Sequence, residues 1–129
     1  MNAQTLRVEI RFLTTEEGGR RTPVILGEWN YRSIAVLGFH RTAPPPASSD
    51  AEAVARGVYG VWLRGGPDPL DLGTTVRAEL AIPMYAPGYE RLLAEGQFTL
   101  LEGFRVVGHG RALGTVDAVS PLSQGPTRE

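Results

Sequence analysis

Side chains able to do acid–base or metal chemistry are few in this 129-residue chain, and they are scattered along it. The two histidines, His40 and His109, lie far apart and outside any H-x-H or H-E-x-x-H spacing that would direct two imidazoles to one metal ion. The absence of cysteine removes thiolate ligands, cysteine nucleophiles and disulfides together. The sequence therefore predicts neither a metal site nor a cofactor.

Hydroxyl and carboxylate groups show no catalytic pattern either. None of the serines lies in the G-x-S-x-G context of a nucleophile elbow. Asp68 and Asp71 flank Pro69, where acidic residues more often shape a turn than form an acid–base pair. The absence of lysine also excludes a G-x-x-x-x-G-K-[S/T] phosphate loop. We therefore expect a chain that is not an enzyme and does not hydrolyse GTP.

Charge is balanced, with 13 basic residues, all of them arginine, against 14 acidic ones. This balance gives no general field for nucleic acid, so an RNA contact would require a local patch. The exclusion of lysine along the whole chain indicates a codon-composition bias rather than selection for arginine at each site.

No apolar run approaches the ~20 residues of a membrane span, and the first residues lack the features of a signal peptide. A cytoplasmic protein without membrane contact is expected.

The dominant pattern along the chain is alternation of apolar and polar residues with a period of two. Over residues 6–12, four apolar side chains alternate with Arg7, Glu9 and Arg11, as expected for a strand with one buried and one solvent-facing side. Short strands separated by glycine and proline turns indicate an antiparallel barrel or sandwich. The predicted strands cover residues 6–12, 22–26, 33–40, 58–64, 76–82, 97–101 and 105–113.

Three segments depart from this alternation. Residues 42–56 contain three consecutive prolines and lack apolar anchors, which predicts a mobile loop with at most one helical turn at its end. Residues 89–96 are helix-like, with Gly96 where the helix would stop. From residue 115 the chain is polar, which predicts a disordered tail over 115–129 after a single domain over 1–114.

Several short sequence motifs, taken in their order along the chain, resemble those of a known family. A strand runs into a glycine-containing turn, an aromatic–arginine pair follows, and two glycine-rich strings close the series. In order they are Glu16-Glu17-Gly18-Gly19-Arg20-Arg21-Thr22-Pro23, Gly27, Tyr31-Arg32, Val58-Tyr59-Gly60-Val61-Trp62-Leu63, Glu102-Gly103 and Val107-Gly108-His109-Gly110. From about Leu6 to Leu113 the chain resembles the third, C-terminal β-barrel domain of elongation factor Tu, with its EEGGR-(H)-TP turn and closing REGG…VGAG hairpin.

The resemblance implies an all-β fold, a closed antiparallel Greek-key β-barrel of about six or seven strands. Gly108 and Gly110 fit this fold, because they leave one face of the last strand nearly without side chains where a barrel closes tightly. The GTPase domain and the middle barrel of the elongation factor have no counterpart in this chain.

The resemblance also implies a candidate RNA site, because this domain of the family grips the T-stem side of aminoacyl-tRNA. Arg20, Glu102 and Gly103 match gripping residues, and Arg21 stands in place of a histidine. A glutamine and a lysine of the family align with two isoleucines, which offer no donor to a phosphate oxygen. Binding of tRNA is therefore the disfavoured alternative, and the two arginines are interpreted as ordinary turn charges. The two isoleucines are Ile34 and Ile82.

Two further surface groups are candidates for contact with a partner. If the first and last strands are neighbours, an arginine-rich patch forms on them, although Glu9 and Glu79 are expected to neutralise it as cross-strand pairs. Trp29 and Tyr85 lie beside turns and are candidate interface aromatics, whereas Trp62 is interpreted as core or barrel-end packing. The patch consists of Arg7, Arg11, Arg105, His109 and Arg111.

The function that the sequence favours is a non-enzymatic binding module whose partner is another protein. An RNA-binding module is the first alternative. A small-molecule binder or hydrolase at the barrel mouth is the second, and it requires a deep pocket with convergent polar groups.

Overall fold

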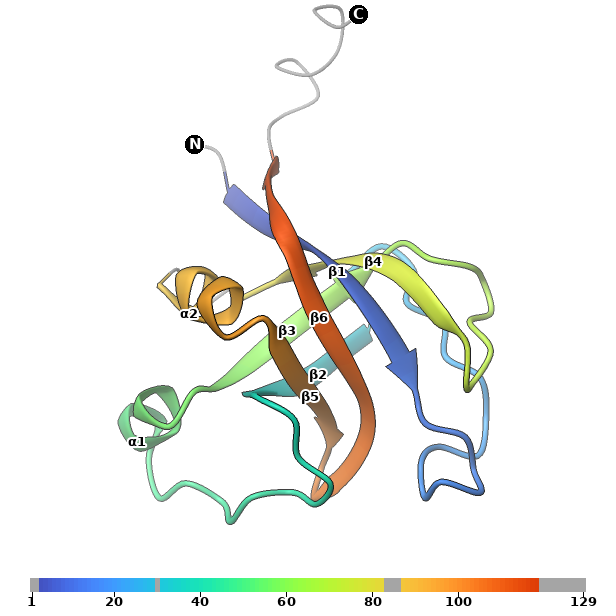
Figure 1. Ribbon diagram of the computed structural model, residues 1–129, viewed down its shortest axis with the longest axis horizontal. Helices are drawn as coiled ribbons and strands as arrows, with labels where there is room; N and C mark the ends of the chain where they lie inside the picture. The colour runs from blue at the N-terminus through green and yellow to red at the C-terminus, as the bar shows by residue number, and fades with distance from the viewer. Residues whose placement is uncertain (1–2, 30, 83–86, 119–129) are drawn as a thin grey trace, which may run out of the picture.

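The computed structural model describes residues 3–29, 31–82 and 87–118, which form a barrel of six strands with two short helices outside it (Figure 1). Its elements are β1 (Ala3–Phe12), β2 (Tyr31–Leu37), α1 (Asp50–Ala55), β3 (Val58–Arg64), β4 (Thr75–Ala81), α2 (Gly88–Glu95), β5 (Gln97–Glu102) and β6 (Arg105–Ala118). Around the barrel the strand order is β1-β4-β3-β2-β5-β6, and every pairing is antiparallel.

The connections follow the Greek-key pattern. Strands β2, β3 and β4 are consecutive neighbours, and β5 returns to lie on the far side of β2. The first and last strands, β1 and β6, pair along their length and close the barrel. The prediction of an all-β, closed antiparallel barrel is confirmed, with six strands.

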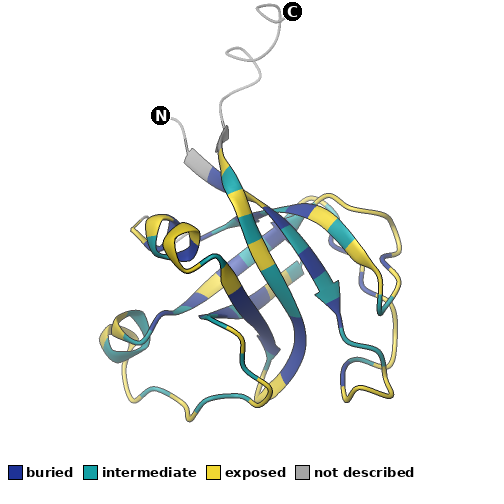
Figure 2. Ribbon diagram, in the orientation of Figure 1, coloured by how far each residue is buried: buried dark blue, intermediate teal, exposed yellow. Residues whose placement is uncertain are grey.

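The alternation of β1 fills the barrel interior. Leu6, Val8, Ile10 and Phe12 are at most 1% exposed, whereas the charged residues between them lie on the outer face (Figure 2). Burial of each such side chain contributes about 1.5–3 kcal/mol of hydrophobic free energy. Other large side chains without exposed surface are Leu26, Leu63, Leu70, Leu80, Leu92, Phe98 and Leu100.

Glycines of β6 let a large ring occupy the same interior. Phe98 of β5 lies directly opposite Gly110 of β6, and a Cβ atom at Gly110 would lie only 2.3 Å from the Phe98 Cζ atom. At Gly108 a Cβ atom would lie 2.9 Å from the backbone oxygen of Arg11 in β1. The nearly bare face predicted for the last strand is therefore the face on which β6 packs closely against the core and β1.

The predicted strand over residues 22–26 does not form. Only Val24 pairs, through two backbone hydrogen bonds with Leu70 whose N–O distances are 3.1 and 2.7 Å. Pro23 has no N–H to donate to a ladder, and Gly27 turns the chain with φ 60°. Val24 and Leu26 are nevertheless buried in the core, so their alternation indicated burial without a strand.

Two strand ends also differ from prediction. Strand β2 ends at Leu37 rather than His40, because Gly38 has φ 87° and turns the chain while its N–H bonds the Gln97 carbonyl at 2.8 Å. Strand β6 continues to Ala118 through its pairing with the first residues of β1. Residues 115–118 therefore belong to the barrel and not to the predicted tail, whose remaining part lies outside the described residues.

A short helix, α1, replaces part of the loop predicted over residues 42–56. Ser49 caps its N-terminus by accepting a hydrogen bond from the Glu52 N–H at 3.1 Å. At its other end Arg91 of α2 donates to the carbonyls of Val54 and Ala55 at 2.6 and 3.4 Å. The helix predicted over residues 89–96 is confirmed as α2, which ends before Gly96.

Replacing Arg91 with alanine is expected to lower the free energy of unfolding by about 1 kcal/mol, because the last carbonyls of α1 lose their donor. Amide hydrogen exchange is expected to accelerate first at residues 53–57, as α1 detaches from α2. Arg91→Lys is the matched variant, because one ammonium cannot reproduce the planar fork that reaches both carbonyls. Unchanged exchange in both variants would contradict this role.

Candidate binding site

A cluster of polar side chains closes the end of the barrel at which the β5–β6 hairpin lies. Glu102, the last residue of β5, accepts hydrogen bonds through Oε2 from the Arg20 guanidinium and from the Tyr31 hydroxyl. Arg20 comes from the turn after β1 and also donates to the Thr22 carbonyl at 3.3 Å. Tyr31 opens β2 and packs edge-on against Phe12, with the ring centroids 5.6 Å apart. Three segments distant in the sequence therefore meet at one carboxylate.

The structure thus brings Arg20 and Glu102, two of the candidate RNA residues, into contact with each other, and it adds Tyr31 to the cluster. Burial raises the pKa of the Tyr31 hydroxyl well above its ordinary value, and the hydrogen bond to the Glu102 carboxylate raises it further. The hydroxyl therefore remains a neutral donor through the physiological pH range.

The raised pKa of Tyr31 predicts a loss of stability in alkali. Because the pKa is higher in the folded protein, the full contribution is present below the ordinary tyrosine pKa of about 10 and is lost as pH rises toward the folded value. Urea unfolding between pH 8 and pH 11 is expected to show a steeper fall in the free energy of unfolding for the wild type than for Tyr31→Phe. Parallel pH profiles would contradict the assignment.

The candidate RNA residues lie in different environments. The Arg20 guanidinium is already bound to Glu102, while Arg21 and Gly103 are exposed in turns. Ile82 is only 3% exposed, and its N–H donates to the Tyr89 hydroxyl at 2.7 Å. The position at which the family has a lysine before proline therefore lies inside the fold.

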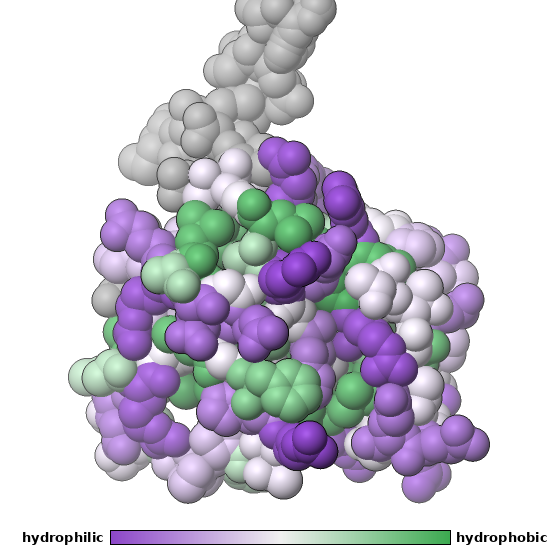
Figure 3. Space-filling model, viewed as in Figure 1, coloured by the Kyte–Doolittle hydropathy of each residue, from purple (hydrophilic) through white to green (hydrophobic). Residues whose placement is uncertain are grey.

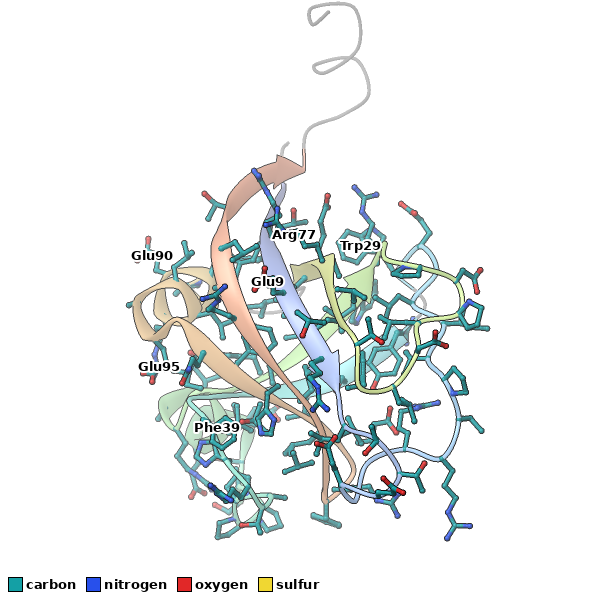
Figure 4. The ribbon with its side chains drawn as sticks, turned by 45° about the vertical axis from the view of Figure 1, so that its right-hand side comes forward. Glu9, Trp29, Phe39, Arg77, Glu90 and Glu95 are labelled. Carbon is teal, nitrogen blue, oxygen red and sulfur yellow. The ribbon has the colours of Figure 1, made fainter. Side chains whose placement is uncertain are left out.

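The predicted arginine-rich patch is divided by carboxylates. Arg111 of β6 donates to Glu9 of β1 at 2.7 Å, and Arg77 of β4 lies 3.8 Å from the same carboxylate. In Figure 4, Glu9 and Arg77 lie side by side on the front of the barrel. Figure 3 shows hydrophilic and hydrophobic residues interspersed over this face, without one large apolar area.

The other patch residues are dispersed. Arg11 pairs with Glu17 of the following turn at 3.1 Å, and Arg7 lies opposite Glu79 in the β1–β4 register. Arg105 lies apart from both, at the β5–β6 hairpin. Cross-strand carboxylates thus accompany the arginines as expected, and the five residues do not act as one cationic surface.

His109 belongs to a small aromatic stack on the same face. Its Nε2 atom lies 2.9 Å from the His40 carbonyl oxygen, and its ring stacks on Phe39 with centroids 4.1 Å apart and an interplanar angle of 20°. Both histidines are therefore held by backbone carbonyls, since His40 Nε2 lies 2.8 Å from the Leu37 oxygen. Among the described residues no group of three or more histidine, aspartate or glutamate side chains could hold a metal ion.

The tryptophans lie on the outside of the barrel in contact with arginines. The Arg64 guanidinium lies 5.0 Å from the centroid of the Trp29 ring, and Arg32 lies 4.6 Å from that of Trp62. Trp62 is half-buried on the outer face of β3, so the first alternative of its interpretation as core or barrel-end packing is wrong. The other candidate aromatic, Tyr85, lies outside the described residues.

Sequence reasoning missed an apolar groove on the outer wall of the barrel, with a volume of about 390 Å³. Ile34 of β2, Val58 of β3 and Leu101 of β5 form its floor, and residues 43–49 form one wall. Phe104 of the β5–β6 hairpin lines the rim and is 79% exposed. We refer to these residues together as the outer groove.

Among the described residues, the barrel interior is filled by core side chains, including Phe12, Phe98 and Leu100. Within the described ranges, no helix has the length and apolar character needed to cross a membrane. Comparison with models of protein families and with curated proteins finds no match.

Proposed function

We propose that this chain is a non-enzymatic, cytoplasmic binding module related to the C-terminal barrel of elongation factor Tu, and that its ligand is another protein bound in the outer groove. The proposal is supported above all by the exposed apolar surface of the groove. An exposed phenylalanine beside a concave apolar floor is typical of protein interfaces, in which a few buried aromatic and aliphatic anchors supply most of the binding energy.

The composition of the floor favours a protein over RNA. The half-buried Ile34 and Val58 and the buried Leu101 line the floor with hydrocarbon and offer no hydrogen-bond donor to a phosphate. Apolar side chains of a protein gain free energy on entering such a surface, at about 25 cal/mol per Å² of apolar area removed from water.

Gly60 provides a way to block the groove without disturbing the fold. It lies on the outer face of β3, directly opposite Ile34 and two residues from Val58. A Cβ atom at Gly60 meets nothing within 4 Å, and the same holds for Gly114 on β6. Gly60→Gln therefore places a bulky polar side chain beside the floor, while Gly114→Gln is a matched control on another strand.

The test is affinity capture on immobilised wild-type and variant proteins from a lysate of the source cells, with protein and RNA both identified. We expect at least one protein to bind the wild type and Gly114→Gln and to be lost from Gly60→Gln. Retention of every captured protein by Gly60→Gln would contradict the proposal. Capture of RNA alone, with a salt-sensitive shift of tRNA mobility, would favour the RNA alternative instead.

A further inference from the structure

We propose that the outer groove takes an extended, acidic segment of a partner protein in which aspartate or glutamate residues alternate with apolar side chains. This inference rests on the proposed function and adds the chemistry of the ligand. Two observations support the inference: the apolar floor of the groove and the charge of its surroundings.

Apolar residues on the floor come from outward-facing positions of neighbouring strands. Ile34 lies opposite Gly60 on one side and Leu101 on the other, so the missing side chain at Gly60 leaves the floor open toward β3. An extended segment has the same period of two as the strands beneath it. Alternate side chains of such a ligand would therefore face the floor while the others face the surroundings.

Several arginines close in sequence to the lining residues, although not part of the lining, have no carboxylate partner among the described residues. Arg32 lies two residues before Ile34 on the same outward face of β2 and is held over the Trp62 ring. Arg105 follows Phe104 and donates only to the Gly19 carbonyl, at 3.3 Å. Two further exposed arginines also lack a carboxylate partner among the described residues. Arg21 lies in the turn that carries Arg20, and Arg41 lies just before residues 43–49.

Some arginines contact a glutamate on both sides of the barrel. Those near the groove are Arg20 and Arg56, and those on the other side are Arg11, Arg64, Arg77 and Arg111. Near the groove, Glu102 is paired with Arg20 and Glu52 with Arg56, and Asp50 at the start of α1 is the charged residue of the lining itself. The arginines left without a carboxylate outnumber this one aspartate, so the surroundings carry net positive charge although the chain as a whole has a net charge of −1. A ligand with the opposite charge gains a faster encounter and is favoured over ligands of like charge.

The same charge argues against other occupants. A second copy of this chain would bring identical cationic surroundings to the interface, because a two-fold contact places the same patch on both subunits. Nucleic acid would satisfy the arginines and has an exposed ring to stack on in Phe104, but the aliphatic floor offers neither a ring to a base nor a donor to a phosphate.

Three fluorescein-labelled peptides of equal length provide the test, with anisotropy measured at low and at physiological salt. The first alternates leucine with glutamate, the second alternates leucine with lysine, and the third alternates serine with glutamate. We expect the first peptide to bind the wild type and Gly114→Gln, and to bind Gly60→Gln at least about tenfold more weakly. The lysine and serine peptides are expected to bind at least about tenfold more weakly than the first.

Charge-reversal variants distinguish the effect of the arginines near the groove from the effect of the protein's overall charge. Arg32→Glu combined with Arg105→Glu is expected to weaken the leucine–glutamate peptide by at least about tenfold, whereas Arg77→Glu on the opposite side leaves it within about twofold. Equal binding of the serine–glutamate peptide, or equal weakening by Arg77→Glu, would overturn the inference. If a captured protein is lost in Gly60→Gln but unaffected by the double reversal, the proposed function stands and the acidic ligand is wrong.

Discussion

Replacing Gly110 with alanine lowers the free energy of unfolding by about 1–3 kcal/mol, the range for adding a methyl group to a filled core. The new Cβ atom would lie 2.3 and 2.6 Å from the Cζ and Cε1 atoms of Phe98 and 2.9 Å from the Ile10 Cγ2 atom. Phe98 has no exposed surface, so its ring cannot swing outward to make room. Urea unfolding measures the loss, and Gly114→Ala, whose Cβ atom meets nothing within 4 Å, serves as the control on the same strand.

A double-mutant cycle isolates the contact between the two strands. Phe98→Leu alone leaves a space in the core and is expected to cost about 1–3 kcal/mol. Combined with Gly110→Ala, the two losses are expected to be less than additive, because the shorter side chain makes room for the added methyl group. Strict additivity would show that the ring and the glycine do not meet.

Glu102→Ala has the second large expected effect, a loss of about 1–3 kcal/mol, because two donors lose their shared acceptor. The Tyr31 hydroxyl and the Arg20 guanidinium both bind this carboxylate at the closed end of the barrel. Glu102→Gln keeps an acceptor oxygen and is expected to recover part of the loss. Thermal and urea unfolding measure the difference.

Glu90→Ala provides the control for the loss of a carboxylate. Glu90 is exposed on α2, away from the barrel end, and its replacement is expected to change the free energy of unfolding by less than about 0.5 kcal/mol. An equally small effect of Glu102→Ala would contradict a stabilising role for the cluster.

Most of the fold could be predicted because alternation of side chains directly reflects strand geometry. Residues 6–12 show this most clearly, since every predicted inward side chain is buried. Residues 22–26 were misassigned for a related reason, because Val24 and Leu26 are buried by an irregular segment with the same spacing. Alternation reports which side chains face the core, and it does not report whether the backbone is paired.

The candidate site was only partly accessible from the sequence. The family resemblance singled out Arg20 and Glu102 as separate RNA contacts, and their pairing with each other was not predicted, since nothing in residue spacing brings two groups so distant in the chain together. Trp62 was misplaced because a strand position alone does not fix which side faces the core. The divided arginine patch was anticipated, since cross-strand neighbours on one face are the expected partners of charged side chains.

The sequence contains a pattern that indicates the outer groove, namely pairs of consecutive apolar residues within strands, and the strand prediction did not use it. Consecutive apolar residues, as in Leu100-Leu101 and Val106-Val107, place one side chain in the interior and the next on the outer wall. Strands with apolar residues on both faces are usually covered on both sides. A search for such doubled positions would have pointed to the outer wall.

The most direct test of the account is to map where a ligand contacts the protein, by backbone amide chemical shifts of the labelled chain during titration with the leucine–glutamate peptide. We predict that the shifts concentrate at the outer groove, at Ile34, Val58, Gly60, Leu101 and Phe104. Shifts confined to the opposite face, around Phe39, His109 and Arg111, with the groove unchanged, would contradict it.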